Sequence, residues 1–189
     1  MEKVSKDQQE KFTWEEITEM SIPHTIHIGD FEEDALLEFT RDINEAKEYL
    51  RKDVYINSRG GYVNMIAPMK DMLESHKANL IATTNIYSAG FILFFTTKVN
   101  REILDGTLGM FHYPFLPMAK LLPDNRVDTR DSKLMELEMK LRIPYEEYLK
   151  ELLGITKTKH KALLKGEEMV YETKELRKLL EKSNKMLDI

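Results

Sequence analysis

A serine, a histidine and a double-glycine turn are the residues of this sequence best suited to chemistry. Ser88 lies in YSAG (87–90), His112 lies in MFHYP (110–114), and the turn NSRGG (57–61) precedes both. Acyl transfer needs a hydroxyl nucleophile, a base that takes its proton, and free backbone N–H groups that hold the oxyanion. The order and context of the three parts, more than any one of them, indicate this chemistry.

Each part also has an ordinary structural use. Serine is a preferred helix N-cap residue, and Ser88 precedes a segment that we expect to be helical. Paired glycines such as Gly60 and Gly61 commonly form plain turns between a strand and a helix. His112 is one of five histidines, but its place at the end of an expected strand suits a general base better than the places of the other four.

The segments around these residues predict alternating strands and helices. Short apolar runs alternate with helical spacing, a rhythm typical of an α/β domain with a mainly parallel sheet. Ser88 would then lie where a strand passes into a helix, so that free N–H groups and the helix dipole favour negative charge beside it. The helix over 34–51 should bury Leu36, Phe39 (or Leu37), Ile43, Ala46 and Leu50. The expected strands are 25–29, 54–56, 80–84, 101–104, 109–112 and 169–171, and the expected helices are 34–51, 65–75, 89–97, 158–165 and 173–182.

We expect residues 1–20 to form a polar N-terminal arm and residues 21–189 to form a single domain. The region 132–153 is rich in Leu, Met, Glu and Lys and reads as helical, but Pro144 interrupts it. A proline in a helix interior costs ~3 kcal/mol because it lacks the N–H and clashes with the preceding turn. Two helices are therefore predicted here, the second beginning at Pro144 and ending near Gly154.

Composition excludes several classes of function. The net charge of -5 leaves no basic surface of the kind that nucleic-acid-binding proteins carry, and the absence of cysteine excludes disulfides, thiol catalysis and thiolate metal sites. The wider glycine pattern of a dinucleotide site and the lysine of a phosphate loop are missing. The N-terminus lacks the apolar segment of a signal peptide, and no apolar run approaches the roughly 20 residues that cross a bilayer. We expect a soluble, cytoplasmic protein without a metal, an organic cofactor, or a nucleic-acid or membrane partner.

Three motifs in one order resemble the proteolytic subunit of the Clp protease, a family of serine peptidases. They are Asn57-Ser58-x-Gly60-Gly61-x-Val63, Ser88-Ala89-Gly90 and Met110-Phe111-His112-x-Pro114. The resemblance runs from about Thr25 to Pro114 and is more diffuse towards Glu175. It implies an α/β spiral of the ClpP and crotonase type with a mainly parallel sheet, and it places the region 132–153 where the family has its long handle helix.

The resemblance also implies the roles of individual residues. Ser88 would be the nucleophile and His112 would be the base. The backbone amides of Gly61 and Ala89 would form the oxyanion hole. No metal and no organic cofactor takes part in the chemistry that the family resemblance implies.

Substrate and partners follow from the same resemblance. Gly60, Tyr62 and Val63 would border the groove in which an extended polypeptide binds as an added strand. In the family the handle helix interleaves two rings, which implies a ring-shaped homo-oligomer that encloses the active sites. Any AAA+ unfoldase that works with the ring would bring its own nucleotide site.

The third member of the triad is ambiguous. The family has an aspartate just before a short strand and a capped helix, and the matching stretch here contains Glu167 and Glu168. Alignment from the start of the last helix selects Glu168, which we favour, whereas alignment from Gly154 without a gap selects Glu167. Adjacent strand residues point to opposite faces, so only one of the two can reach His112. A solvated acidic turn is the structural alternative for both.

Several positions depart from the family pattern and indicate a divergent member. Arg59 replaces the usual proline of the glycine turn, Ile86 and Tyr87 replace small residues before Ser88, and Pro144 breaks the handle. The first hypothesis is a serine endopeptidase that hydrolyses extended or unfolded polypeptides. The alternatives are a catalytically inactive ClpP-like ring or scaffold subunit, and an acyl-CoA hydratase or isomerase on the crotonase fold.

Overall fold

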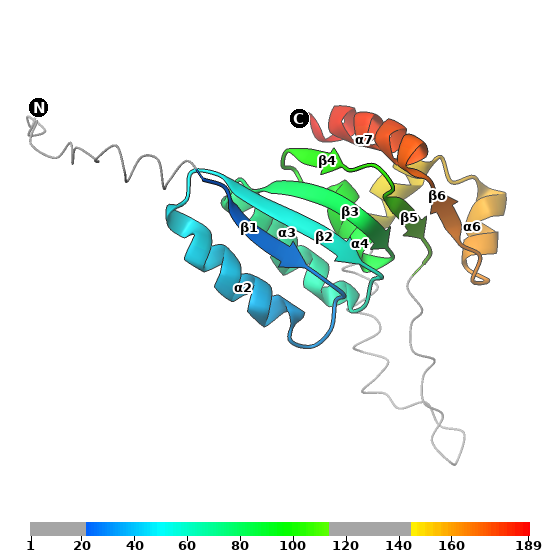
Figure 1. The fold of residues 1–189 in the computed structure, drawn as a ribbon. Coiled ribbons are helices and arrows are strands. Elements are labelled where there is room, and N and C mark those ends of the chain that lie inside the picture. Colours follow the sequence, from blue (N-terminus) through cyan, green and yellow to red (C-terminus); the bar gives the residue numbers. More distant parts are fainter. Residues whose placement is uncertain (1–21, 114–144) are drawn as a thin grey trace, which may run out of the picture.

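The structure, a computed structural model, describes residues 22–113 and 145–189. The described residues form a six-stranded sheet in the order β1-β2-β3-β5-β6, with β4 beside the first half of β3 (Figure 1). The strands are β1 (His24–Ile28), β2 (Lys52–Ser58), β3 (Asn79–Tyr87), β4 (Arg101–Ile103), β5 (Leu108–Phe111) and β6 (Met169–Tyr171). The helices are α2 (Ala35–Glu45), α3 (Ile66–Ser75), α4 (Ala89–Thr96), α6 (Lys157–Leu163) and α7 (Thr173–Leu187), with 3-10 turns η1 (Ala46–Glu48) and η2 (Val63–Met65) and a further helical segment at 145–153.

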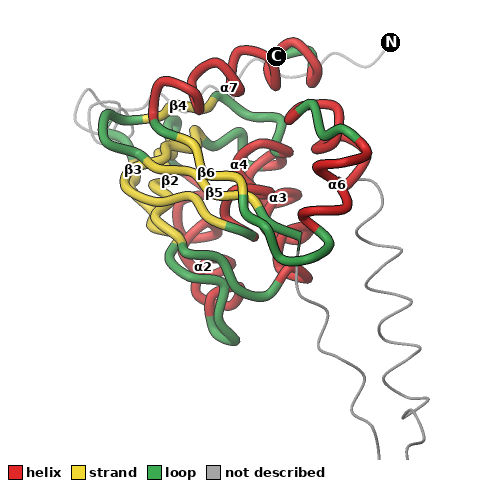
Figure 2. The backbone as a smooth tube through the Cα atoms, turned by 90° about the vertical axis from the view of Figure 1, so that its right-hand side faces the viewer, coloured by secondary structure: helices red, strands yellow, loops and turns green. Residues whose placement is uncertain are grey.

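The sheet is mainly parallel, as the alternation of strands and helices predicted. Every strand pair from β1 to β5 is parallel, and only β6 runs antiparallel to its neighbour β5. Helices α2, α3 and α4 connect successive strands and cover one face of the sheet (Figures 1 and 2). The strands alternate accordingly: in β1, Ile26 and Ile28 are buried under the helices, whereas Thr25 and His27 are exposed.

Helix α4 lies at the centre of the core. All eight of its residues are buried, because the helix is enclosed by β3, β5, α3 and α7. A helix that is buried on every side carries a continuous apolar sequence in place of an amphipathic stripe. Its Phe91 ring lies 5.8 Å from the ring of Phe111 in β5 and 5.8 Å from that of Tyr171 in β6, which fixes the helix against the strands that continue towards His112 and Glu168.

Strand β3 changes partner along its length. Leu80–Ala82 pairs with β4, and Asn85–Tyr87 pairs with β5. Against β2, the register shifts by two residues between Ile56 and Ser58. The side-chain oxygen of Asn57 accepts a hydrogen bond from the Asn85 backbone N–H at 3.2 Å. This bond gives the Asn85 N–H an acceptor at the point where the β2–β3 ladder is irregular. Such bulges bend a strand and re-aim the side chains that follow, here directly before Ser88.

Two helix ends differ from the prediction by five residues or more. Helix α2 ends at Glu45, and its continuation is a 3-10 turn followed by extended backbone at Tyr49. The expectation that Leu50 is buried was therefore wrong: the break in helical spacing turns it outward, and it is 73% exposed. Of the two alternatives for the second inward position, Phe39 is buried and Leu37 is exposed. Helix α7 continues to Leu187, five residues beyond the expected end at 182.

Several predictions lie outside the described residues, namely the arm at 1–20 and most of the handle region, including Pro144. Within the described part, residues 145–153 are helical and Gly154 follows in a turn with φ +63°. A C-terminal glycine with positive φ is a common helix end, so the predicted end near Gly154 is confirmed. Across the two described ranges, no helix has the length and apolarity that crossing a membrane requires.

Candidate active site

Ser88 occupies a sharp turn between β3 and α4. Its backbone has φ +51° and ψ -115°, a conformation that costs a non-glycine residue on the order of 1–3 kcal/mol. A strained strand-to-helix turn presents the hydroxyl of a nucleophile above a sheet in other hydrolase folds. The backbone N–H of Ser88 donates to the Met110 carbonyl at 2.8 Å, which ties the turn to β5.

The side chain of Ser88 does not act as a helix cap. Ser88 holds the N-cap position of α4, yet its hydroxyl makes no capping hydrogen bond. Nor does any other group within 22–113 or 145–189 hydrogen-bond to this hydroxyl. A serine kept in a strained conformation without the stabilisation of a cap is not explained by the ordinary structural use of serine.

The glycine turn lies directly against this serine. Gly60 has φ +109°, and a methyl group added to it would lie 2.6 Å from the Cβ of Ser88 and 3.1 Å from its Oγ. Gly61 has φ +131°, and a methyl group there would overlap the backbone of Phe31. Both positions therefore require glycine for two reasons: the positive φ and the close approach of the neighbouring residue.

The turn is held by the chain segment that follows β1. Phe31 N–H donates to the Gly60 carbonyl at 2.7 Å, and Tyr62 N–H donates to the Phe31 carbonyl at 2.8 Å. This parallel pairing leaves the N–H and C=O of Gly61 directed away from Phe31. The amide of Gly60 is already engaged, since it donates to Ser58 Oγ at 3.1 Å.

An ion pair that the sequence did not predict supports the same turn. Arg59, noted only as a replacement for proline, donates through its backbone N–H to Asp30 at 2.6 Å and through its guanidinium at 2.8 Å. Asp30 stands 29 residues earlier in the chain, so no local spacing could reveal the pair. The Arg59 side chain is 79% exposed, and the charge pairing alone contributes at most about 1 kcal/mol.

The two amides expected to form the oxyanion hole are both available. Among the described groups, neither the N–H of Gly61 nor that of Ala89 has an acceptor. Ala89 is the first residue of α4, where N–H groups have no partner within the helix and the dipole favours negative charge. An oxyanion beside Ser88 would therefore meet unused donors.

His112 directly follows β5, the strand next to the serine. The register pairs Tyr87 with Met110, so the strands that carry Ser88 and His112 end at the same edge of the sheet. The imidazole is half-buried, and its Nδ1 atom is shielded from solvent. The structure has no hydrogen bond between His112 and Ser88 Oγ; such bonds are often long before substrate binds.

The two candidate acids differ in their surroundings. The antiparallel pairing of β5 with β6 ends at Phe111 and Met169; the same register, if continued by one step, would put His112 opposite Glu168. Residues directly opposite in an antiparallel pair project to the same face. Glu168 is exposed, and it makes no hydrogen bond or ion pair with His112 or with any other described residue.

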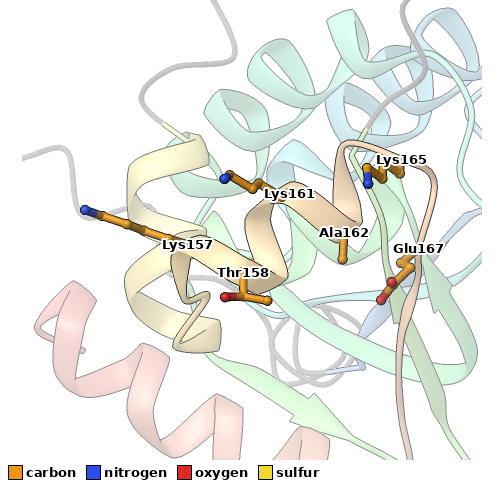
Figure 3. A pocket seen from close by; sticks show the side chains of 6 residues that line it. All are labelled: Lys157, Thr158, Lys161, Ala162, Lys165 and Glu167. Carbon is orange, nitrogen blue, oxygen red and sulfur yellow. The ribbon is translucent and has the colours of Figure 1, made fainter.

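Glu167 lies instead among the lysines of α6. Its carboxylate accepts from Lys159 Nζ at 3.1 Å, and it borders a cavity of about 420 Å³ that is otherwise lined by α6 and the turn after it (Figure 3). Glu167 thus contributes a negative charge to a surface that is rich in lysines. It makes no hydrogen bond with His112 in the described structure. Lys157, Thr158, Lys161, Ala162 and Lys165 are the other residues that line the cavity.

The residues expected to border the substrate follow the glycine turn. Tyr62 is extended and 54% exposed, and Val63 begins the 3-10 turn η2. The Tyr62 N–H already donates to the Phe31 carbonyl. A substrate strand would therefore meet the outward N–H and C=O of Gly61 and the exposed ring of Tyr62. Gly60, one position before Gly61, lies directly against Ser88.

No protein-family model and no curated protein sequence matches the chain. The fold, however, is similar to that of a solved structure, an asparagine-to-aspartate mutant of ClpP1 from Listeria monocytogenes. The TM-score is 0.56 at 18% sequence identity, and the match covers 87% of this chain and 90% of that one. The predicted ClpP-like α/β fold is therefore confirmed, and at this identity the comparison shows the fold alone.

Proposed function

We propose that this chain is a serine endopeptidase that hydrolyses extended or unfolded polypeptides. The observation that carries the proposal is the turn at Ser88. Ser88 has a positive φ, its hydroxyl makes no capping hydrogen bond, and it lies against the glycine turn. The two amides expected to form the oxyanion hole have no acceptor among the described groups. His112 follows the strand that pairs with the one before Ser88. Each of these features serves acyl transfer, and none is needed for an ordinary helix start.

The proposed reaction begins with His112 taking the proton of Ser88 Oγ as the oxygen attacks the scissile carbonyl carbon. The amides of Gly61 and Ala89 donate hydrogen bonds to the oxyanion. The imidazolium then gives its proton to the leaving amine, which departs and leaves an acyl ester on Ser88. A water molecule, deprotonated by the same imidazole, hydrolyses that ester.

Glu168 is the carboxylate that we assign to His112. Its place opposite His112 in the extended β5–β6 register supports this role, and the ion pair of Glu167 with Lys159 argues against the neighbouring residue. The Glu168 side chain would have to turn inward to reach the ring. A carboxylate there selects the imidazole tautomer and stabilises the imidazolium.

We further propose that substrate binds as an added strand along Gly60–Val63 and that copies of the chain assemble into a ring. The outward N–H and C=O of Gly61 support the first part, because they offer an unpaired edge. The ClpP-like fold supports the second. An AAA+ unfoldase would deliver folded substrates to such a ring. Light scattering on the purified chain measures the assembly directly.

Labelling with a fluorophosphonate probe tests the proposed function. The parent protein and Ser75→Ala, which alters an exposed serine at the end of α3, should both be labelled, and Ser88→Ala should not. The parent should also cleave an unfolded protein substrate, with the same dependence on Ser88. A folded parent that is neither labelled nor active contradicts the proposal.

That negative outcome favours the second candidate, a ClpP-like scaffold subunit without activity. Two observations support this candidate: Ser88 and His112 share no hydrogen bond, and Glu168 is exposed. The labelling experiment therefore decides between the two functions, because a scaffold retains its fold and assembly without a reactive serine.

A further inference from the structure

Tyr113, the residue after His112, makes a contact that the reaction above does not use. Its hydroxyl lies 2.8 Å from Nδ1 of His160 in α6, and the two rings meet edge to face at 5.3 Å. Its ring also packs edge to face on Phe111 at 5.6 Å. Tyr113 is only 7% exposed, so it is fixed at both ends, by Phe111 at the ring and by His160 at the hydroxyl.

The contact between Tyr113 and His160 holds the chain after the end of β5. The β5–β6 pairing ends at Phe111, and His112 and Tyr113 follow it. A fixed Tyr113 therefore restrains the backbone of His112 from its C-terminal side, as the β5 ladder does from the other. The direction in which the imidazole projects depends on both restraints.

His160 is a firm anchor for this purpose. It lies in the middle of α6, where its backbone N–H donates to the Thr156 carbonyl at 2.8 Å. The Thr156 side chain in turn caps the helix through the N–H of Lys159, and Leu163 buries the helix end in the core. A side chain on a capped helix whose end packs in the core moves less than one on a loop.

We propose that His160, acting through Tyr113, is a positioning residue for His112. The inference rests on the proposed function, since it assigns the contact to the base of that reaction. Displacement of a catalytic group by about 1 Å can reduce the rate on the order of 100-fold. Loss of one hydrogen bond allows a smaller shift, for which we expect a roughly 10-fold loss of the chemical step.

Three substitutions isolate the contact. Tyr113→Phe removes one oxygen atom and keeps the ring packing. His160→Ala removes the ring nitrogen that pairs with the Tyr113 hydroxyl, and His160→Gln restores a polar group that can bind this hydroxyl. Tyr55→Phe, in β2 on the face of the sheet away from the helices, is the matched control because its ring stacks on His27 and is remote from His112.

The experiment measures the rate constant of fluorophosphonate labelling, the peptide kcat and KM, the pH profile of kcat/KM and the melting temperature of each full-length variant. Tyr113→Phe and His160→Ala should lower labelling and kcat about 10-fold and alter the limb of the pH profile that reports the base. KM should stay within about twofold, since Tyr113 does not border the substrate groove. His160→Gln should recover most of the rate, and Tyr55→Phe should match the parent.

Parental rates in Tyr113→Phe would overturn the inference and leave the proposed function intact. Losses that merely follow the melting temperature, without rescue by His160→Gln, would also overturn it, because they indicate a structural role. A folded parent without labelling would instead refute the proposed function, and this inference with it. Should His160→Ala not fold, Tyr113→Phe carries the test.

Discussion

Gly60 and Ser88 are in such close contact that no side chain fits between them. A methyl group at position 60 would lie within 3.1 Å of the seryl oxygen, although 28 positions separate the two residues in the sequence. The glycine turn and the strand-to-helix turn are therefore one structural unit. This unit brings the outward amide of Gly61 to the edge of the sheet where Ser88 presents its hydroxyl.

Substitution of Gly60 by alanine should reduce labelling of Ser88 strongly and lower the stability of the fold only moderately. The positive φ costs an alanine about 1–2 kcal/mol, and the new methyl group displaces Ser88 as well. We expect labelling of Ser88 to fall by roughly 100-fold or more. Gly106→Ala is the matched control, because Gly106 also has positive φ (+83°) but nothing lies within 4 Å of the added methyl. Equal labelling of the two variants, measured at equal melting temperature, would refute the close contact.

The two glutamates should differ in their effect on catalysis. Glu168→Gln should lower kcat by on the order of 100-fold or more, since an amide cannot stabilise the imidazolium that forms on His112. Glu167→Gln should stay close to the parent, because it breaks only an exposed ion pair with Lys159. Steady-state peptide kinetics on both variants give the answer. The reverse order of effects would move the triad acid to Glu167.

The far end of α4 depends on a buried cation. Arg101 donates to the carbonyls of Phe94 and Phe95 at 3.0 Å each, and to the side chains of Ser183 and Asn184 in α7. It is 7% exposed, and burial lowers its pKa to about 10. Its removal takes the guanidinium donor from the buried Phe94 carbonyl and from the Asn184 side chain, whereas the Phe95 carbonyl keeps the Tyr148 and Ser183 hydroxyls as donors.

Arg101→Met should therefore lower the free energy of unfolding by about 2–4 kcal/mol in urea titrations. Arg41→Met, at a side chain that is 65% exposed, should change it by less than about 0.5 kcal/mol. A similar small loss in both variants would show that the Arg101 hydrogen bonds contribute no net stability.

Alkaline stability should depend on Tyr171. Burial raises the pKa of its phenol to about 12, whereas an unfolded tyrosine titrates near 10. Between these values the unfolded chain has lost the proton and the folded chain keeps it. The stabilisation is complete below pH 10 and is lost as the pH rises towards 12.

Tyr171→Phe should flatten this decline. The measurement is the free energy of unfolding of the parent and of the variant at several pH values from 8 to 12, with the difference between the two curves as the readout. The difference cancels contributions from other groups that titrate in the same range, Arg101 among them. A difference that does not vary with pH would contradict the raised pKa.

Local sequence signals predicted the parts of the site that depend on local structure. The glycines at 60 and 61, the junction at Ser88 and the strand before His112 carry their conformation in their own residue types. Contacts made across the fold left no such signal: Asp30 with Arg59, and Tyr113 with His160, join residues 29 and 47 positions apart. The ends of β3 and α2 were misjudged for the same reason, because pairing with β5 extends one and the turn at 46–48 ends the other. Sequence periodicity alone does not indicate whether Glu167 or Glu168 lies nearer to His112. The β5–β6 register and the ion pair of Glu167 with Lys159 distinguish the positions of the two residues.

The central claim, that Ser88 and His112 act on one carbonyl, is tested most directly with a peptidyl chloromethyl ketone. In a working site the serine adds to the ketone, and the nearby imidazole nitrogen displaces chloride and becomes alkylated. Mass mapping of the labelled protein should place a single adduct on His112, and Ser88→Ala should lose it while keeping its fold. Absence of the adduct from the folded parent, or alkylation of the exposed His27 with His112 untouched, would contradict the claim.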